Sequence, residues 1–165
     1  MRVQFFKADC QETTDITKFG LYDAEDNTPV KIKLTDEELW NATVLNNSGK
    51  SVLYTAIDNC IDVFRPNGNM NNCCDCMLTY NNTLLLVELK NKRESWQSEG
   101  LAQIESIVKT IIEEIPDFSN EFKTRKAIVA NRKHQFPVFH ESNIEQRQTF
   151  RSKYRMRTII ERRNY

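Results

Sequence analysis

Residues 83–90, TLLLVELK, constrain the fold of this chain more than any other stretch. Consecutive apolar residues on both faces are typical of a strand at the centre of a sheet that is covered on both sides. Residues 73–80, CCDCMLTY, have the composition of a second strand, and Asn81–Asn82 between the two runs has the composition of a tight turn. The sequence therefore predicts a hairpin at the centre of a layered structure.

This hairpin carries charged residues that a buried strand does not need. Glu88 and Lys90 are two residues apart, so they project from the same face of their strand. A turn at Asn81–Asn82 places Asp75 opposite Glu88, with Cβ atoms about 4.5–5.5 Å apart. Carboxylates this close repel unless a cation lies between them. Because Mg²⁺ binds one or two carboxylates together with waters and phosphate, the pattern predicts a divalent-metal site.

The remaining pattern predicts helices and strands in alternation. Residues 96–115 carry a continuous apolar stripe at helical spacing, and residues 51–64 show a similar helical pattern. Thr35 followed by Glu38 resembles a capping box, which predicts a helix over residues 35–45. Further expected elements are strands over residues 1–6, 29–34 and 125–131, a polar and basic helix over 141–154, and a last strand over 155–161.

Asp75, a turn and then Glu88-x-Lys90, followed by an amphipathic helix and another strand, resemble the PD-(D/E)xK nuclease superfamily. The resemblance covers about residues 51–131. It implies a single α/β domain over residues 1–165 with a restriction-endonuclease-like αβββαβ core, in which a central mixed sheet is flanked by helices. The N-terminal strands and the C-terminal basic helix and strand would then be additions to this core.

The resemblance also assigns roles to the charged residues. It implies that Asp75, Glu88 and the backbone carbonyl of Leu89 bind Mg²⁺ or Mn²⁺, and that Lys90 assists the attack of water on a phosphodiester. A lysine in this position can position or deprotonate the water, or stabilise the pentavalent phosphate.

The sequence departs from the family pattern in three places. Cys74 stands where the motif has Pro. The acid that many members carry on the first core helix is best matched by Asp58, with Asp62 and Glu38 as alternatives. Gln103 matches the first residue of the Gln-x-x-x-Tyr motif of the exonuclease-like branch and could touch the Lys90 side of the site, but isoleucine replaces the tyrosine.

Charge is unevenly distributed along the chain, although the formal net charge is zero. Residues 125–163 contain 11 Lys and Arg residues against 3 acidic residues, a local charge near +8. A nucleic-acid backbone suits such a segment, and the alternatives are a solvated basic face or a protein partner. The candidate nucleic-acid contacts are Lys92, Arg93, Arg147, Arg151 and Lys153.

The expected function is therefore metal-dependent hydrolysis of phosphodiester bonds in DNA, with RNA as the less favoured substrate. The resemblance further suggests a part in phage defence or DNA processing, beside an ATPase or another protein subunit. Two alternatives stay open. The first is an inactive module that keeps the fold and binds nucleic acid or protein, and the second is a structural subunit in which ELKNK is incidental.

Five cysteines at irregular spacing predict reduced thiols in the cytoplasm. Cys73, Cys74 and Cys76 are interpreted as small buried thiols, because a zinc site usually needs CxxC-type pairs. No apolar run approaches the roughly 18 residues of a membrane span, and no signal-peptide core is apparent at the start. His134 and His140 are interpreted as loop residues.

Overall fold

A six-stranded sheet forms the centre of the computed structural model, which describes residues 3–64, 67–115, 117–132 and 141–162. The strand order is β1-β5-β6-β7-β8-β9. Strands from β1 to β7 pair antiparallel, and β7, β8 and β9 pair parallel. The bounds are β1 (Gln11–Thr14), β5 (Val52–Ala56), β6 (Cys76–Tyr80), β7 (Thr83–Lys90), β8 (Thr124–Asn131) and β9 (Arg157–Arg162). The prediction of an α/β chain with a central mixed sheet is thus confirmed.

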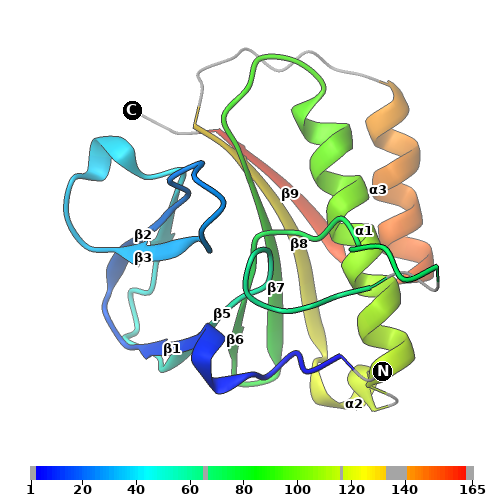
Figure 1. The fold of residues 1–165 in the computed structure, drawn as a ribbon, viewed down its shortest axis with the longest axis horizontal. Helices are drawn as coiled ribbons and strands as arrows, with labels where there is room; N and C mark the ends of the chain where they lie inside the picture. Colours follow the sequence, from blue (N-terminus) through cyan, green and yellow to red (C-terminus); the bar gives the residue numbers. More distant parts are fainter. Residues whose placement is uncertain (1–2, 65–66, 116, 133–140, 163–165) are drawn as a thin grey trace.

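Different layers cover the two faces of this sheet. Figure 1 shows α1 and α3 on one side and a smaller three-stranded sheet, of order β3-β2-β4, on the other. The helices are α1 (Trp96–Glu114), α2 (Phe118–Glu121) and α3 (Glu141–Lys153), and the small sheet consists of β2 (Lys18–Tyr22), β3 (Lys31–Lys33) and β4 (Ala42–Leu45). Two 3₁₀ turns are η1 (Ala8–Cys10) and η2 (Glu37–Leu39).

Strand β7 is buried on both faces, as its sequence predicts. Leu84 and Leu86 belong to the core beneath the helices, and Val87 and Leu89 belong to the core beneath the small sheet. Successive side chains of a strand point to opposite faces, so a strand with layers on both sides needs apolar residues at consecutive positions. The hairpin register is also confirmed, because Cys76 pairs with Val87 and Tyr80 pairs with Thr83.

Helix α1 packs its predicted apolar stripe on β7 and β8. Leu101, Ile104 and Ile107 on this stripe are fully buried. At the first turns of the helix, Gly100 allows the backbone to approach β8, because a Cβ atom there would lie 2.6 Å from Cγ1 of Val129. Gln103, one turn after Gly100 in α1, contacts Lys90 at the carboxyl end of β7.

The Gly100→Ala variant should therefore lose stability despite the better helix propensity of alanine. Overpacking of a well-packed core typically costs about 1–3 kcal/mol, which exceeds the roughly 1 kcal/mol that alanine contributes over glycine in a helix. Denaturant unfolding measures the change. Adding Val129→Ala should recover part of the loss, giving a non-additive double-mutant cycle. Wild-type stability of Gly100→Ala would contradict the proposed tight contact.

The helix predicted over residues 51–64 is wrong. Residues 52–56 form β5, and a turn follows it. The apolar positions fit both the period of a strand and the period of a helix. Val52, Tyr54 and Ala56 alternate onto the core beneath the small sheet. Ile57 and Ile61 come after the strand has ended and pack in the core beneath the helices. The four-residue spacing was therefore produced by a strand and the turn that follows it. The first helix of the implied αβββαβ core is consequently not found in these residues.

Two further predictions near the N-terminus are wrong. The capping box at Thr35 does not start a long helix; residues 37–39 form one 3₁₀ turn and residues 42–45 form β4. Trp40 explains this change, since its ring packs against Gly20 of β2, where a Cβ would lie 2.1 Å from the ring. The predicted strand at residues 1–6 is absent from residues 3–6, where Phe5 is buried in the core instead. The strand expected over residues 29–34 is present as β3.

A disulfide joins Cys10 to Cys60, which contradicts the expectation that all five cysteines are reduced. The bond links η1 to the turn after β5, across a sequence separation of 50 residues. The enclosed loop contains β1 and the whole small sheet. Irregular spacing hid this pair because the two cysteines become neighbours only through the pairing of β1 with β5.

Replacing both cysteines with serine should destabilise the protein markedly. A cross-link over a loop of this length contributes about 4 kcal/mol in the chain-entropy model, because it restricts the unfolded chain. Urea unfolding under oxidising conditions should show this loss in Cys10→Ser/Cys60→Ser. Reduction of the wild type should give the same loss and should leave the double variant unchanged. Equal stability of the oxidised wild type and the double variant would contradict the prediction.

No helix in the described ranges is both long and apolar enough to cross a bilayer. His134 and His140, which are predicted to be loop residues, lie outside the described residues.

Candidate metal site

Asp75 and Glu88 meet at the carboxyl end of β7, as the register predicts. The backbone N–H of Asp75 donates to Oε2 of Glu88 at 3.1 Å, and the backbone N–H of Leu89 donates to Oδ2 of Asp75 at 2.6 Å. Each carboxylate is therefore anchored by the backbone of the other strand. Asp75 is 8% exposed and Glu88 is 2% exposed, so both lie in the protein interior.

Lys90 lies on the same side of the site. Its Nζ is 3.0 Å from Oε1 of Glu88, and the Lys90 side chain is 13% exposed. Nζ also donates to Oε1 of Gln103 on α1, and Nε2 of Gln103 in turn donates to the carbonyl of Cys73 at 3.3 Å. Gln103 therefore connects the lysine to the segment before Asp75, which supports the expectation that it touches the Lys90 side of the site.

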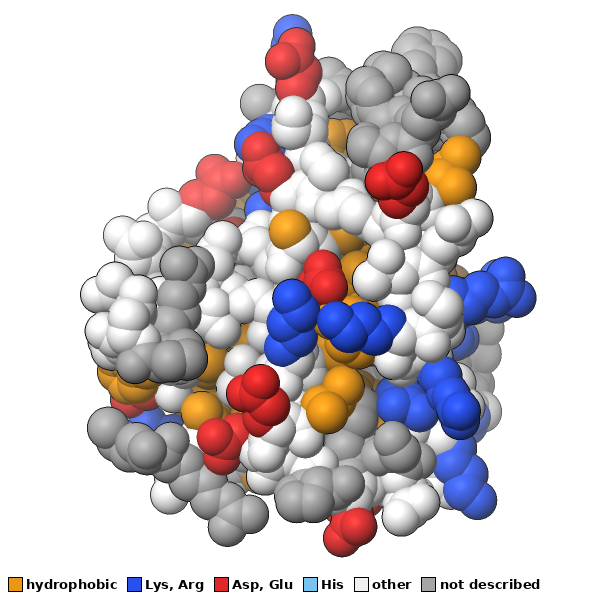
Figure 2. All heavy atoms as spheres, turned by 90° about the vertical axis from the view of Figure 1, so that its right-hand side faces the viewer, with side chains coloured by type: hydrophobic (Ala, Val, Ile, Leu, Met, Phe, Trp, Pro, Cys, Tyr) orange, Lys and Arg blue, Asp and Glu red, His pale blue; other side chains and the backbone are white. Residues whose placement is uncertain are grey.

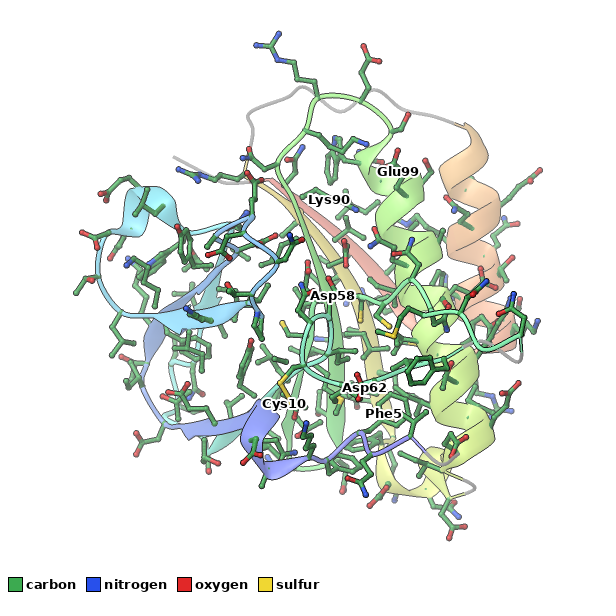
Figure 3. The ribbon with its side chains drawn as sticks, viewed as in Figure 1. Phe5, Cys10, Asp58, Asp62, Lys90 and Glu99 are labelled. Carbon is green, nitrogen blue, oxygen red and sulfur yellow. A yellow bond between two sulfur atoms is a disulfide. The ribbon has the colours of Figure 1, made fainter. Side chains whose placement is uncertain are left out.

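Asp58 reaches the site from the turn after β5, and not from a helix. The backbone N–H groups of Ile57 and Asp58 donate to the carbonyl of Asp75, at 2.9 and 3.3 Å. Asn59 has a φ of 60° and helps to reverse the chain here. Figure 3 shows Asp58 near the middle of the sheet, below Lys90.

Asp62 and Glu38 are the alternatives for the additional acid. Asp62 is exposed, and Figure 3 places it beyond Asp58, farther from Lys90 and near Phe5. Glu38 lies in η2 at the edge of the small sheet. Of the three, only Asp58 shares backbone hydrogen bonds with Asp75 among the described residues.

Asp23 is an acidic neighbour that sequence reasoning missed. It follows β2, and its backbone N–H donates to Oδ1 of the buried Asn41 at 3.0 Å. Its negative charge acts on both Asp58 and Asp75. The signal in the sequence was the acidic turn DAEDNT, which could not be placed near the hairpin before the two sheets were known to stack.

Burial and neighbouring negative charges raise the pKa values of Asp75 and Glu88. Burial, together with the charges of Asp23 and Asp58, raises the pKa of Asp75 from 3.8 to about 7, although the hydrogen bond from Leu89 acts in the opposite direction. Burial also raises the pKa of Glu88 well above its ordinary value; the charge of Asp75 adds to this effect and Lys90 opposes it. The metal-free protein thus holds these carboxylates in an environment that disfavours their charged forms.

A hard divalent cation would suit this donor set. Buried carboxylate oxygens on adjacent strands are ligands that Mg²⁺ accepts, and Mg²⁺ typically uses only one or two of them with waters and a substrate phosphate. Within the described ranges, no three His, Cys, Asp or Glu side chains are arranged as a complete metal-binding group. If Asp75 and Glu88 held such an ion, its remaining ligands would come from water and substrate.

The buried cysteines beside the site are confirmed as thiols. Cys73, Cys74 and Cys76 are free and buried. Burial raises the pKa of Cys73 to about 12 and raises the pKa values of Cys74 and Cys76 well above the ordinary value. The prediction of small buried thiols is thus confirmed, and the prediction that they do not bind zinc stays a prediction.

Leu89 is buried against the small-sheet core, opposite Glu88 and Lys90, as expected; metal binding by its carbonyl stays a prediction. Lys92 is near the site, but its Nζ forms an ion pair with Glu99 at 2.6 Å. Arg93 is exposed in the same loop. The loop is held by Asn131, whose Nδ2 donates to the Lys92 carbonyl at 2.8 Å.

The three basic residues of α3 do not line the metal site. Arg147 is bound to β9, because its Nε donates to Oγ1 of Thr158 at 2.8 Å. Arg151 and Lys153 are exposed in the last turn of α3. Since α3 packs on α1 and β9, the structure does not bring these cations together with Asp75 and Glu88.

Comparisons of this chain with protein-family models, curated proteins and solved structures gave no match.

Proposed function

We propose that this protein is a metal-dependent nuclease that hydrolyses phosphodiester bonds, with DNA as the favoured substrate and RNA as the alternative. The observation that carries the proposal is the burial of Asp75 and Glu88 against each other with Lys90 beside them. Buried carboxylates without a cation are costly, and an ion pair with one lysine compensates only part of that cost. A bound Mg²⁺ or Mn²⁺ would offset the remaining cost and would give the buried carboxylates a role in hydrolysis.

The residues of the site have different roles in the proposed reaction. Asp75 and Glu88 would hold the cation, which supplies Lewis-acid polarisation of the phosphate and a more acidic bound water. Lys90 is held by Glu88 and Gln103, so its ammonium group is positioned to orient the attacking water or to stabilise negative charge on the phosphate. Asp58 and Asp23 add negative potential that favours a divalent cation over a monovalent one.

The order of elements supports a restriction-endonuclease-like core as part of this proposal. Strands β5, β6 and β7, followed by α1 and β8, reproduce the βββαβ portion of the expected arrangement. The acid expected on a preceding helix is replaced by Asp58 on the turn after β5. An acid on a turn instead of a helix is compatible with the same chemistry, because the reaction depends on the residues of the site and not on the fold.

Cleavage assays with Lys90→Met test the proposal. The wild type should cleave or nick a panel of linear and circular DNA substrates when Mg²⁺ or Mn²⁺ is added, and EDTA should stop the reaction. Lys90→Met should lose cleavage by at least about 100-fold, the usual scale for a lost acid–base or electrostatic group. The variant should still bind Mn²⁺, because both carboxylates remain.

Lys18→Met is the matched control, since Lys18 also pairs with an acidic residue, Glu37, but lies on β2 in the small sheet. Its cleavage rate should stay close to that of the wild type. Full activity of Lys90→Met would refute the role of the lysine. Mn²⁺ binding at Asp75 and Glu88 without cleavage of any DNA or RNA would instead favour an inactive binding module.

A further inference from the structure

The segment 151–157, RSKYRMR, places a cation at every second position. Arg151, Lys153, Arg155 and Arg157 are all exposed, whereas Tyr154 and Met156 between them are buried. The backbone enforces this arrangement, because the N–H groups of Tyr154 and Met156 both donate to the carbonyl of Phe150. The chain reverses from α3 into β9 at Arg155, whose φ is 51°. The four cations therefore lie on an ordered connection between two packed elements.

No acidic side chain of the described residues neutralises these cations by a salt bridge. Several lysines elsewhere form salt bridges, among them Lys18 with Glu37, Lys90 with Glu88 and Lys109 with Glu105. For Arg151, Arg155 and Arg157, in contrast, no described carboxylate lies within 4.0 Å. Lys153 instead lies 5.4 Å from the ring of Tyr154. The helix dipole accounts for cations in the last turn of α3, but it does not account for Arg155 and Arg157 beyond it.

Strand β8 adds two more cations to this group. Lys126 pairs directly with Arg157. Burial lowers the pKa of Arg125, the preceding residue, and the positive charge of Arg155 lowers it further. Like charges gathered in this way cost free energy in the isolated protein and favour an anionic partner. Figure 2 shows Lys and Arg side chains gathered toward one edge of the face that carries α1 and α3, without acidic side chains among them.

The distance from this group to the metal site follows from the strand pairing. Arg157 pairs with Lys126, and five residues later in β8 Asn131 pairs with Lys90. At about 3.3 Å per residue, the two places are about 17 Å apart along the sheet. A cation at that distance cannot contact the phosphate that is cleaved. It can contact the same nucleic acid about five base pairs away, since duplex DNA rises about 3.4 Å per base pair.

We propose that Arg151, Lys153, Arg155 and Arg157, here called the basic ridge, bind the phosphate backbone of nucleic acid at a second place, about five base pairs from the candidate metal site. This inference rests on the proposed function for its choice of nucleic acid over other polyanions. The basic ridge supplies sequence-independent affinity and leaves the chemical step to the site at Asp75 and Glu88. Substrates long enough to reach both places bind more tightly than short ones.

Fluorescence anisotropy in EDTA tests binding separately from cleavage. The probes are a labelled duplex of about 24 base pairs and a labelled hairpin with a stem of about 4 base pairs, because that stem is shorter than the separation of about five base pairs between the two places. Replacement of all four ridge residues with Gln should weaken binding of the long duplex by at least about tenfold and reduce the salt slope by about 3. Binding of the hairpin should change much less.

A matched control removes the same charge elsewhere. Lys7, Lys18, Lys31 and Lys50 are exposed on other parts of the chain, and their replacement with Gln should leave binding of the long duplex within about twofold. Circular dichroism and thermal unfolding establish that both variants are folded. Arg151→Glu/Lys153→Glu, which leaves β9 intact, should weaken binding in the same direction.

Equal affinity and salt slope for the wild type and the ridge variant would overturn the proposal, as would an equal effect of the control. Loss of binding to vesicles containing anionic lipid, with unchanged DNA binding, would also overturn it and assign the ridge to a membrane surface. If DNA binding depends on the ridge but Mg²⁺ and Mn²⁺ support no cleavage, the ridge stands and the nuclease proposal fails.

Discussion

Replacement of Asp75 with Asn lowers cleavage by at least about 1000-fold and, at pH 8 in EDTA, raises the melting temperature. The loss of activity is expected because a missing ligand removes several kcal/mol of transition-state stabilisation, at 1.36 kcal/mol for each factor of ten. The gain in stability is expected because a neutral amide avoids the cost of a buried charge next to Glu88. Asn can still accept the hydrogen bond from Leu89 with its carbonyl oxygen.

A variant that loses activity but gains stability has not lost its activity by unfolding. These opposite changes in Asp75→Asn would therefore indicate a functional role for Asp75. Asp62→Asn is the matched control, because Asp62 is exposed in the same connection between β5 and β6. It should change neither the cleavage rate nor the melting temperature appreciably. Cleavage at near wild-type rates by Asp75→Asn would exclude this residue as a metal ligand. A lower melting temperature of Asp75→Asn at pH 8 would contradict the account of the charged pair.

The metal-free protein should become less stable as the pH rises from about 4 to about 7. The pKa of Asp75 is raised from 3.8 to about 7 in the folded state, so the folded state binds more protons than the unfolded state across this window. The stabilising contribution is therefore complete at low pH and is lost as Asp75 ionises. Glu88 acts in the same direction, because burial raises its pKa as well.

Divalent cations should reverse this trend. Protons and the cation compete for the same carboxylates, so the affinity for Mn²⁺ should rise with pH and level off for Asp75 above about 7. Thermal unfolding at several pH values, in EDTA and in Mn²⁺, measures both effects. The stabilisation by Mn²⁺ should be larger at pH 8 than at pH 5. An equal Mn²⁺ effect at both pH values would contradict the assignment of the cation to protonatable carboxylates.

The centre of this site could be predicted from sequence because it depends on local rules. One turn, at Asn81–Asn82, determines the pairing of β6 with β7 and therefore brings Asp75 opposite Glu88. Side-chain alternation then places Lys90 on the same face. The apolar stripe of α1 was equally local, and it placed Gln103 where it meets Lys90.

The surroundings of the site could not be predicted because they depend on contacts between distant segments. Asp23 joins the site only after the small sheet packs on the central one, and Cys10 meets Cys60 only after β1 pairs with β5. The error at residues 51–64 had a different cause. Val52, Ala56 and Ile57 have the spacing of a helix, but they belong to a strand and its following turn, which bury them in two separate cores.

Anomalous diffraction from crystals soaked in Mn²⁺ at pH 8 tests the central claim most directly. The account predicts a peak about 2.0–2.1 Å from carboxylate oxygens of both Asp75 and Glu88. The peak should be absent from crystals of Asp75→Asn grown under the same conditions. No peak between these carboxylates at saturating Mn²⁺, or a peak that persists in Asp75→Asn, would contradict the claim that they form a metal site.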